Sequence, residues 1–293
     1  MNLQIRYTTT FNYPKTVRDS HNVLKACPTS NAAQTLESYD LAIDPPARVF
    51  SYVDYWGTRV DSFGIFEPHE QLTIVATSHV VTHPAPSIDL SIDVARYAEP
   101  DYRVEYRAYL DPTRHTEWTP PLAELARDTV HGVEDANGAA TRLMEAVRDR
   151  LSYAPGSTYV GMELAQVLEN GQGVCQDYAH AHIALARSVG IPARYVSGYL
   201  YAADQSLGST PDEAEIDVET HAWVEIHIPG WGWQPFDPTN GTPVAESHVK
   251  IGHGRDYDDV APLRGVYHGP EDHELGVSVR ISREELAGRQ SQQ

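Results

Sequence analysis

Apolar and polar residues alternate along the chain up to about Val104, and this period of two constrains the fold more than any other feature. Clear examples are "LQIRYTTTFNY", "QTLESYDLAIDP" and "LTIVATSHVVTH", with turn residues such as Pro45-Pro46 and Trp56-Gly57 between such segments. Alternation puts the apolar side chains on one face of a strand, and turn residues between such segments are typical of antiparallel sheets. The pattern predicts a β-rich N-terminal domain over residues 1–108.

The pattern changes to helical periodicity near Tyr109. The segment "PPLAELARDTV" opens on prolines, which suit a first helical turn, and "NGAATRLMEAVRDRLSY" repeats apolar residues at every fourth position. In "VCQDYAHAHIALARSVG" apolar residues recur at steps of four and three, which predicts a buried helix that ends at Gly190. A length of 293 residues suits two domains. We therefore predict an α+β fold with a boundary at about residues 105–118 and a second domain over residues 109–293.

The formal net charge of −19 at pH 7 excludes some classes of partner. Such a charge repels phosphate backbones and anionic lipids, so we expect no nucleic-acid or membrane partner. The first residues lack the apolar core of a signal peptide, and no later segment approaches the ~20 apolar residues of a membrane span. These features predict a cytoplasmic protein. Cys27 and Cys175 do not make the dense disulfide framework of a small secreted domain, so we expect two free thiols.

Cys175 follows a glycine pair in "GQGVC", at the predicted start of the buried helix. Unpaired backbone N–H groups and the positive end of the helix dipole favour thiolate over thiol at such a position. The flanking glycines allow a ligand to approach closely. The position suits a nucleophile, although a small core residue would fit there equally well.

A base for this thiol is predicted in "HAWVEIHIPGWGWQPFDPTNG", which begins at His221 and contains Asp237. A strand, a Pro-Gly turn and a second strand predict a hairpin. With Pro229 at its midpoint, the imidazole of His221 and the carboxylate of Asp237 face each other across the ladder, whereas a slip of one residue would separate them. Taken alone, His221 suits an edge strand and Asp237 suits a turn. Together with Cys175 they predict a catalytic triad.

The 14 histidines do not predict a metal site. His180 and His182 lie two apart on a helix and point in different directions, while His227 is ~20 Å along the strand from His221 at about 3.3 Å per residue. The acidic segment 203–220 lacks the regular spacing of a calcium-binding loop and is predicted to form a flap over the site. We expect no cofactor and no metal ion.

Several segments resemble the motifs of the transglutaminase-like superfamily, whose core is similar to that of papain-like cysteine proteases. "GQGVCQDYAHAHIALARSVGIPARYVSGYL" resembles its nucleophile motif, "HAWVEI" its histidine motif and "WGWQPFDPTNG" its aspartate motif. "YVDYWGTRVDSFGI" resembles the β-rich N-terminal region of bacterial members, and "GRDYDDVAPLRGVYHGPEDHELGVSVRI" resembles their final strands. The resemblance therefore covers nearly the whole chain.

The resemblance implies that Cys175 is the nucleophile, His221 the base and then the acid, and Asp237 the group that orients the histidine. It implies attack on a peptide or glutamine carboxamide through a thioester, which is released to an amine or to water. The backbone N–H of Cys175 is the first expected donor to the oxyanion, while Gln172 is expected to face solvent. The expected partner is a peptide or protein substrate. The alternative is a non-catalytic peptide-binding module that keeps the papain-like groove.

Overall fold

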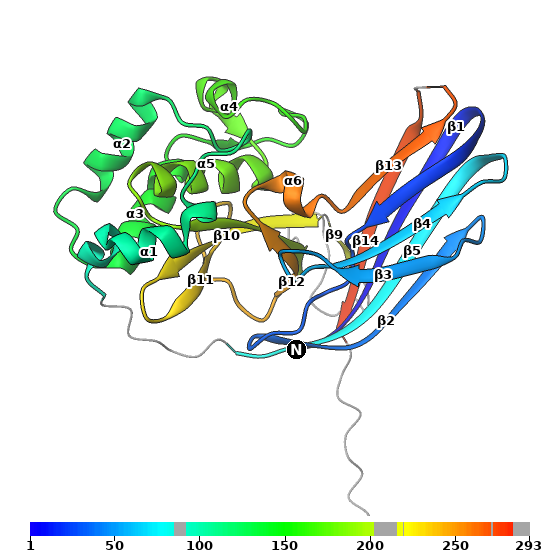
Figure 1. Cartoon of the computed structure of the whole chain (residues 1–293), viewed down its shortest axis with the longest axis horizontal. Helices are drawn as coiled ribbons and strands as arrows, with labels where there is room; N and C mark the ends of the chain where they lie inside the picture. Colours follow the sequence, from blue (N-terminus) through cyan, green and yellow to red (C-terminus); the bar gives the residue numbers. More distant parts are fainter. Residues whose placement is uncertain (85–91, 202–215, 219, 271, 284–293) are drawn as a thin grey trace, which may run out of the picture.

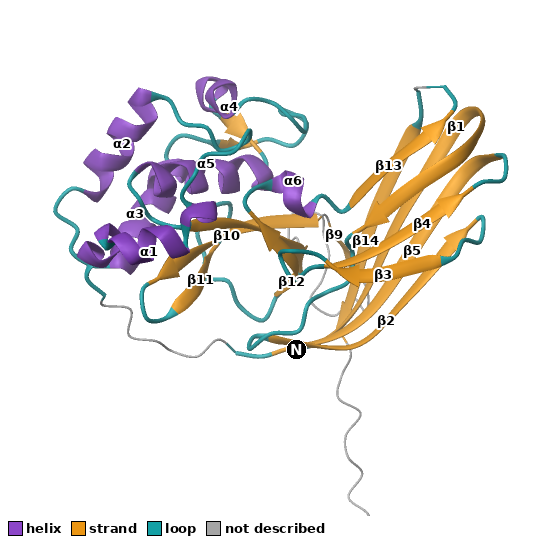
Figure 2. Cartoon of the chain, in the orientation of Figure 1, coloured by secondary structure: helices purple, strands orange, loops and turns teal. Residues whose placement is uncertain are grey.

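The computed structural model describes residues 1–84, 92–201, 216–218, 220–270 and 272–283. A large antiparallel sheet lies beside a smaller sheet that is covered by helices (Figures 1 and 2). The N-terminal strands are β1 (Asn2–Leu24), β2 (Gln34–Asp44), β3 (Val49–Val53), β4 (Arg59–Ile65) and β5 (His69–Thr82). The arrangement confirms the predicted α+β class and the β-rich N-terminal region.

The alternation of apolar residues builds the core of the large sheet. Along β5, Leu72, Ile74 and Val80 are buried while the residues between the buried positions are partly exposed. The first part of β1 pairs with β5, and its Leu3 lies opposite Val80. Both side chains point to the buried face because the strand period is two. Burial of this stripe on one face is the main stabilising contribution to the sheet.

The last two strands also belong to the large sheet, namely β13 (Leu263–His268) and β14 (Glu274–Arg283). β14 pairs with β1, with Ile281 opposite Ile5, and β13 pairs with the second half of β1. The predicted second domain, 109–293, includes these strands, whereas the structure pairs them with the N-terminal strands (Figure 1). The reason is that one edge of β1 pairs with β5, and β14 pairs with the other edge of β1. The boundary at residues 105–118 stays a prediction.

The smaller sheet has the strand order β11-β10-β8-β12 with antiparallel neighbours. Its strands are β8 (Ala193–Leu200), β10 (Thr220–Ile228), β11 (Gly232–Phe236) and β12 (His248–Gly254). The short strands are β6 (Ser152–Tyr153), β7 (Gln172–Gly173) and β9 (Ile216–Val218). The helices are η1 (Val94–Ala98), α1 (Pro100–Glu105), η2 (Arg107–Tyr109), α2 (Pro120–Val130), α3 (Ala136–Arg148), α4 (Leu164–Asn170), α5 (Cys175–Ser188) and α6 (Tyr257–Val260).

Helix α5 is buried along most of its length and packs against β10, with α2 and α3 beside it. Val224 and Ile226 of β10 share one apolar core with Ile183 of α5 and Leu143 of α3. Gly190 follows the helix with φ of +82°, a left-handed conformation that favours glycine and ends a helix. The structure therefore confirms the predicted buried helix and its end.

The two sheets share a second core. Tyr199 of β8 and Val249 of β12 pack with the apolar face of the large sheet. At the start of β2, the side-chain amide of Gln34 accepts the N–H of Lys250 at 2.7 Å and donates to the carbonyl of Lys250 at 2.8 Å. These contacts hold β12, the strand that begins with His248, in place.

Candidate active site

Cys175 is the first residue of α5, as the sequence predicts. The N–H of the preceding Val174 donates to Asp177 Oδ2 at 2.8 Å, and the Thr158 hydroxyl donates to the same oxygen at 2.7 Å. Gly173 is needed in this turn because a Cβ there would lie only 2.8 Å from the Cβ of Asp177. The contacts fix the turn so that the thiol lies at the positive end of the helix dipole.

The Cys175 thiol also lies at the beginning of β10. Its Sγ is 3.9 Å from the carbonyl oxygen of Thr220, the residue before His221. The cysteine is free and partly exposed, so a ligand can reach the sulfur. Its backbone N–H belongs to the first turn, where such groups have no acceptor within the helix.

The hairpin between β10 and β11 forms, but its centre differs from the predicted one. Val224 pairs with Phe236 and Ile228 pairs with Gly232, so the midpoint is Gly230 and not Pro229. This register places Asp237 diagonally from His221 and not directly opposite it. Moving the midpoint by one residue changes the register by two, and a shift of two keeps a side chain on the same face of the sheet. The side chains of His221 and Asp237 therefore still lie on the same face of the sheet, as the prediction requires.

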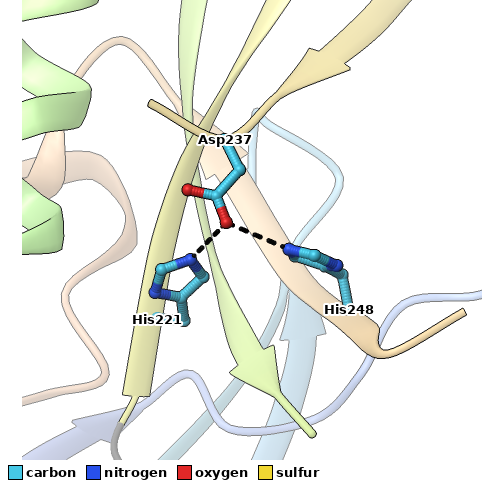
Figure 3. A group of neighbouring side chains, drawn as sticks. All are labelled: His221, Asp237 and His248. Atoms are coloured by element: carbon cyan, nitrogen blue, oxygen red, sulfur yellow. Dashed lines mark hydrogen bonds and ion pairs between the residues drawn. The ribbon is translucent and has the colours of Figure 1, made fainter. Parts of the chain in front are cut away.

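Asp237 is fully buried, and both of its carboxylate oxygens accept hydrogen bonds. His221 Nε2 lies 2.9 Å from Oδ2, as Figure 3 shows. The side-chain amide of Asn240 donates to the same oxygen at 2.7 Å. Backbone N–H groups of Thr239 and Asn240 donate to Oδ1 at 3.0 and 3.1 Å. The turn after β11 thus builds a cradle of donors that orients this carboxylate toward His221.

The charges of this pair stabilise each other. Burial alone would lower the pKa of His221, but hydrogen bonds to Asp237 and Cys175 raise this pKa to about 9. Burial alone would raise the pKa of Asp237, but hydrogen bonds from His221, His248 and Asn240 hold it well below its usual range. Because Nε2 of His221 faces Asp237, Nδ1 is the ring nitrogen left for the thiol. The arrangement can therefore hold an imidazolium between a thiolate and a carboxylate.

Two residues of this site, His248 and Asn240, are not predicted from the sequence. His248 Nε2 lies 3.2 Å from Asp237 Oδ2, so two histidines meet at one oxygen (Figure 3). Asn240 has a local signal, since it follows Asp237 in the turn "DPTNG" and an asparagine in a turn commonly bonds nearby groups. No pattern near His248 in the sequence predicts its contact with Asp237, because this contact depends on the pairing of β12 with another strand.

Structural contacts or burial account for His180, His182, Cys27 and Gln172. His182 Nε2 donates to the Ala140 carbonyl at 3.1 Å, and His180 Nε2 accepts the N–H of Tyr257 at 3.2 Å. Cys27 is buried, and burial raises the pKa of its thiol to about 11. Most of the predicted acidic flap, 203–220, lies outside the described residues. Gln172 is exposed and pairs with Ser152.

Among the residues that the structure describes, two groups of side chains have ligand atoms close enough together to hold a metal ion, all within 4.8 Å of one another. One group is His221, Asp237 and His248, whose geometry the hydrogen bonds already explain. The other group is His115, Asp256 and Asp258, where Asp258 also pairs with Arg264 at 2.7 Å.

Comparisons with known proteins agree with this architecture. Residues 123–238 match the transglutaminase-like superfamily, and residues 3–81 match the bacterial transglutaminase-like N-terminal region. An uncharacterized protein of Mycobacterium leprae is 33% identical over 285 residues, which is 96% of this chain and 98% of the relative. A protein-glutamine gamma-glutamyltransferase of Pseudomonas aeruginosa is 37% identical over 73 residues, which is 25% of this chain and 11% of that protein.

One solved structure is similar over nearly the whole chain. The crystal structure of a candidate cysteine protease from Cytophaga hutchinsonii superposes with a TM-score of 0.75 at 22% identity, and the match covers 98% of this chain and 92% of that one. At this identity the similarity shows the fold. With the match to residues 123–238 and the full-length relative, it follows that the chain belongs to the transglutaminase-like superfamily and carries the N-terminal region of its bacterial members.

Proposed function

We propose that the protein is a cysteine enzyme that transfers the acyl group of a peptide or glutamine carboxamide through a thioester on Cys175. The observation that carries the proposal is the position of His221. Its Nε2 bonds the buried Asp237, and it directly follows Thr220, whose carbonyl oxygen lies 3.9 Å from Cys175 Sγ. The helix start supplies the nucleophile's environment, and the hairpin supplies the base and its orienting group. A nucleophile, a base and an orienting carboxylate within hydrogen-bonding reach are the requirements of covalent acyl transfer.

In the proposed reaction, His221 Nδ1 takes the proton of the Cys175 thiol, and the thiolate attacks the carboxamide carbon. The carbonyl oxygen becomes an oxyanion, which the backbone N–H of Cys175 stabilises. When the carbon–nitrogen bond breaks, the imidazolium of His221 gives its proton to the leaving nitrogen. An amine or a water molecule then attacks the thioester while His221 accepts its proton, and the thiol is regenerated. Throughout these steps Asp237 remains an anion that stabilises the imidazolium.

The segment that follows Thr158 supports a peptide as the substrate. Tyr159 and Val160 expose 66% and 60% of their surface on the segment that follows Thr158. Thr158 bonds Asp177 in the first turn of α5, so this segment is tied to the helix that begins with Cys175. Exposed apolar side chains on a segment tied to the nucleophile's helix offer contact area to the side chains of a bound peptide. We therefore propose a peptide or protein substrate, with no nucleic acid and no membrane as partner.

The cellular location stays a prediction. Across the described residues, the helices are all too short or too polar to traverse a lipid bilayer. The cytoplasmic location proposed from the sequence can be tested by cell fractionation with an antibody against the chain.

Mass spectrometry of the intact protein tests the proposed function. The protein is incubated with a glutamine-containing peptide, with and without a primary amine, and the Cys175→Ala variant is treated in the same way. We expect a covalent adduct or its products with the wild-type protein and none with the variant. Transfer to the amine indicates transamidation, and release of the acid alone indicates hydrolysis.

The same experiment addresses the alternative function. A peptide-binding module would bind the peptide in a groove without any adduct, and its affinity would be the same for Cys175→Ser as for the wild-type protein. Absence of an adduct with glutamine peptides and with cysteine-directed acylating probes, combined with peptide binding, would refute the enzyme proposal and support the binding module.

A further inference from the structure

The second histidine of the site has a different hydrogen-bond environment from the first. His248 is buried, and its Nε2 lies 3.2 Å from Asp237 Oδ2. Its Nδ1 lies 3.3 Å from the backbone nitrogen of Ala245 and 3.3 Å from the hydroxyl oxygen of Ser247. Both ring nitrogens of His248 are therefore engaged inside the protein, whereas His221 has one nitrogen directed to Asp237 and the other left for Cys175.

The contact with Ala245 determines which nitrogen of His248 carries the proton. A backbone N–H can only donate, so Nδ1 must be an unprotonated acceptor. A neutral imidazole has one proton, which must then lie on Nε2. Since Nε2 faces Asp237, His248 donates a hydrogen bond to the carboxylate and has no nitrogen free to accept a proton from a substrate or a thiol.

Packing holds the His248 ring in this orientation. Trp223 lies edge-on to it, with ring centroids 5.4 Å apart and an interplanar angle of 82°. Trp223 is itself buried against Gly198, where a Cβ would collide with the indole ring. The strand β12 that carries His248 is anchored by Gln34 through the backbone of Lys250. Packing of the ring and hydrogen bonds of its strand thus both hold the donor toward Asp237.

We propose that His248 is a positioning residue that acts through Asp237. With its proton on Nε2, it donates to Oδ2 and keeps the carboxylate directed at His221. This inference rests on the proposed function only in assigning His221 as the base. The division of labour follows from the ring nitrogens: His221 exchanges a proton with Cys175, and His248 keeps its own.

Three variants test the positioning role. His248→Leu removes the donor, His248→Gln keeps a side-chain N–H that can reach Asp237, and His253→Gln is a matched control on the same strand. Nuclear magnetic resonance titration of His221 and thermal unfolding are measured for each. We expect the proton affinity of His221 to fall about tenfold in His248→Leu, because Oδ2 is no longer held toward the imidazole and the hydrogen bond between Asp237 and His221 weakens; tenfold is the scale of one hydrogen bond to a charged group. We expect the proton affinity of His221 to be mostly restored in His248→Gln and unchanged in His253→Gln.

A merely structural role gives a different pattern. It would lower the unfolding temperature of both His248 variants without changing the titration of His221. An unchanged or increased proton affinity of His221 in folded His248→Leu would overturn the proposal. If His248→Leu does not fold, nitrogen-15 chemical shifts of the wild-type protein decide the question: a proton on His248 Nε2 supports the proposal and a proton on Nδ1 overturns it.

These measurements are independent of turnover. Failure of the wild-type protein to form a covalent adduct with a glutamine peptide counts against the proposed function. An unchanged His221 titration in His248→Leu counts against the positioning role alone. The two failures can therefore be told apart.

Discussion

Replacing Asp237 by Asn removes the charge that holds His221 protonated, while the size of the side chain is preserved. In asparagine an NH2 group, which donates, replaces one of the two carboxylate oxygens. The amide therefore cannot accept all the hydrogen bonds that the carboxylate accepts from His221 and Asn240. Burial of His221 remains, and burial lowers the pKa of an imidazole. We therefore expect the pKa of His221 to fall from about 9 toward or below its ordinary value of 6.5.

The magnitude follows from the size of the shift. A change from 6.5 to about 9 corresponds to about 3 kcal/mol at ~1.36 kcal/mol per pKa unit. Because the pKa is raised in the folded state, this stabilisation is present in full below pH 6.5 and is lost as the pH rises through about 9. The wild-type protein should therefore lose up to about 3 kcal/mol of unfolding free energy from this group across that window, and Asp237→Asn should lose much less.

The assay combines resonance titration of His221 with urea unfolding at the two ends of this pH window. Asp61→Asn is the matched control, because Asp61 is equally buried but bonds Tyr39, Ser51 and Arg59 in the large sheet. The control should have a lower free energy of unfolding, while the pKa of His221 stays unchanged. Turnover of Asp237→Asn should fall by several orders of magnitude, since an amide does not stabilise the imidazolium. A His221 that still titrates near pH 9 in Asp237→Asn would refute the electrostatic account.

Three further outcomes are expected. Iodoacetamide should alkylate Cys175 in the native protein and Cys27 only after unfolding. The reason is that Cys27 is 3% exposed and its pKa is raised to about 11. Peptide mapping measures the labelling of each cysteine, and equal labelling of both in the native protein would contradict the prediction. Asp177→Ala should lower the unfolding free energy by about 1–2 kcal/mol and slow Cys175 alkylation, since it removes the bonds to Val174 and Thr158, and urea unfolding measures the loss. Gly198→Ala should destabilise by about 1–3 kcal/mol, because the added Cβ meets the Trp223 ring and the Val249 carbonyl, and a thermal unfolding scan unchanged from wild type would be inconsistent with that packing.

The local features of this protein are determined by its sequence. The strands β1 and β5 follow from alternation, and α5 follows from apolar residues at steps of three and four that end at Gly190. The same is true of Cys175 at the first position of that helix and of the hairpin that carries His221. These features depend on backbone periodicity and turn residues within about twenty positions, so they can be recognised without knowing the rest of the fold.

Only the tertiary structure decides which distant segments meet. The pairing of β14 with β1 joins residues at opposite ends of the chain, and no local pattern selects this partner among the other strands. His248 reaches Asp237 because β12 pairs with β8, which in turn pairs with β10. Even the register of the hairpin, whose loop is the three residues 229–231, differs from the one that the turn signal predicts. Side-chain periodicity specifies the face of a strand but not its neighbour, and the neighbour is chosen by the free energy of burying whole faces together.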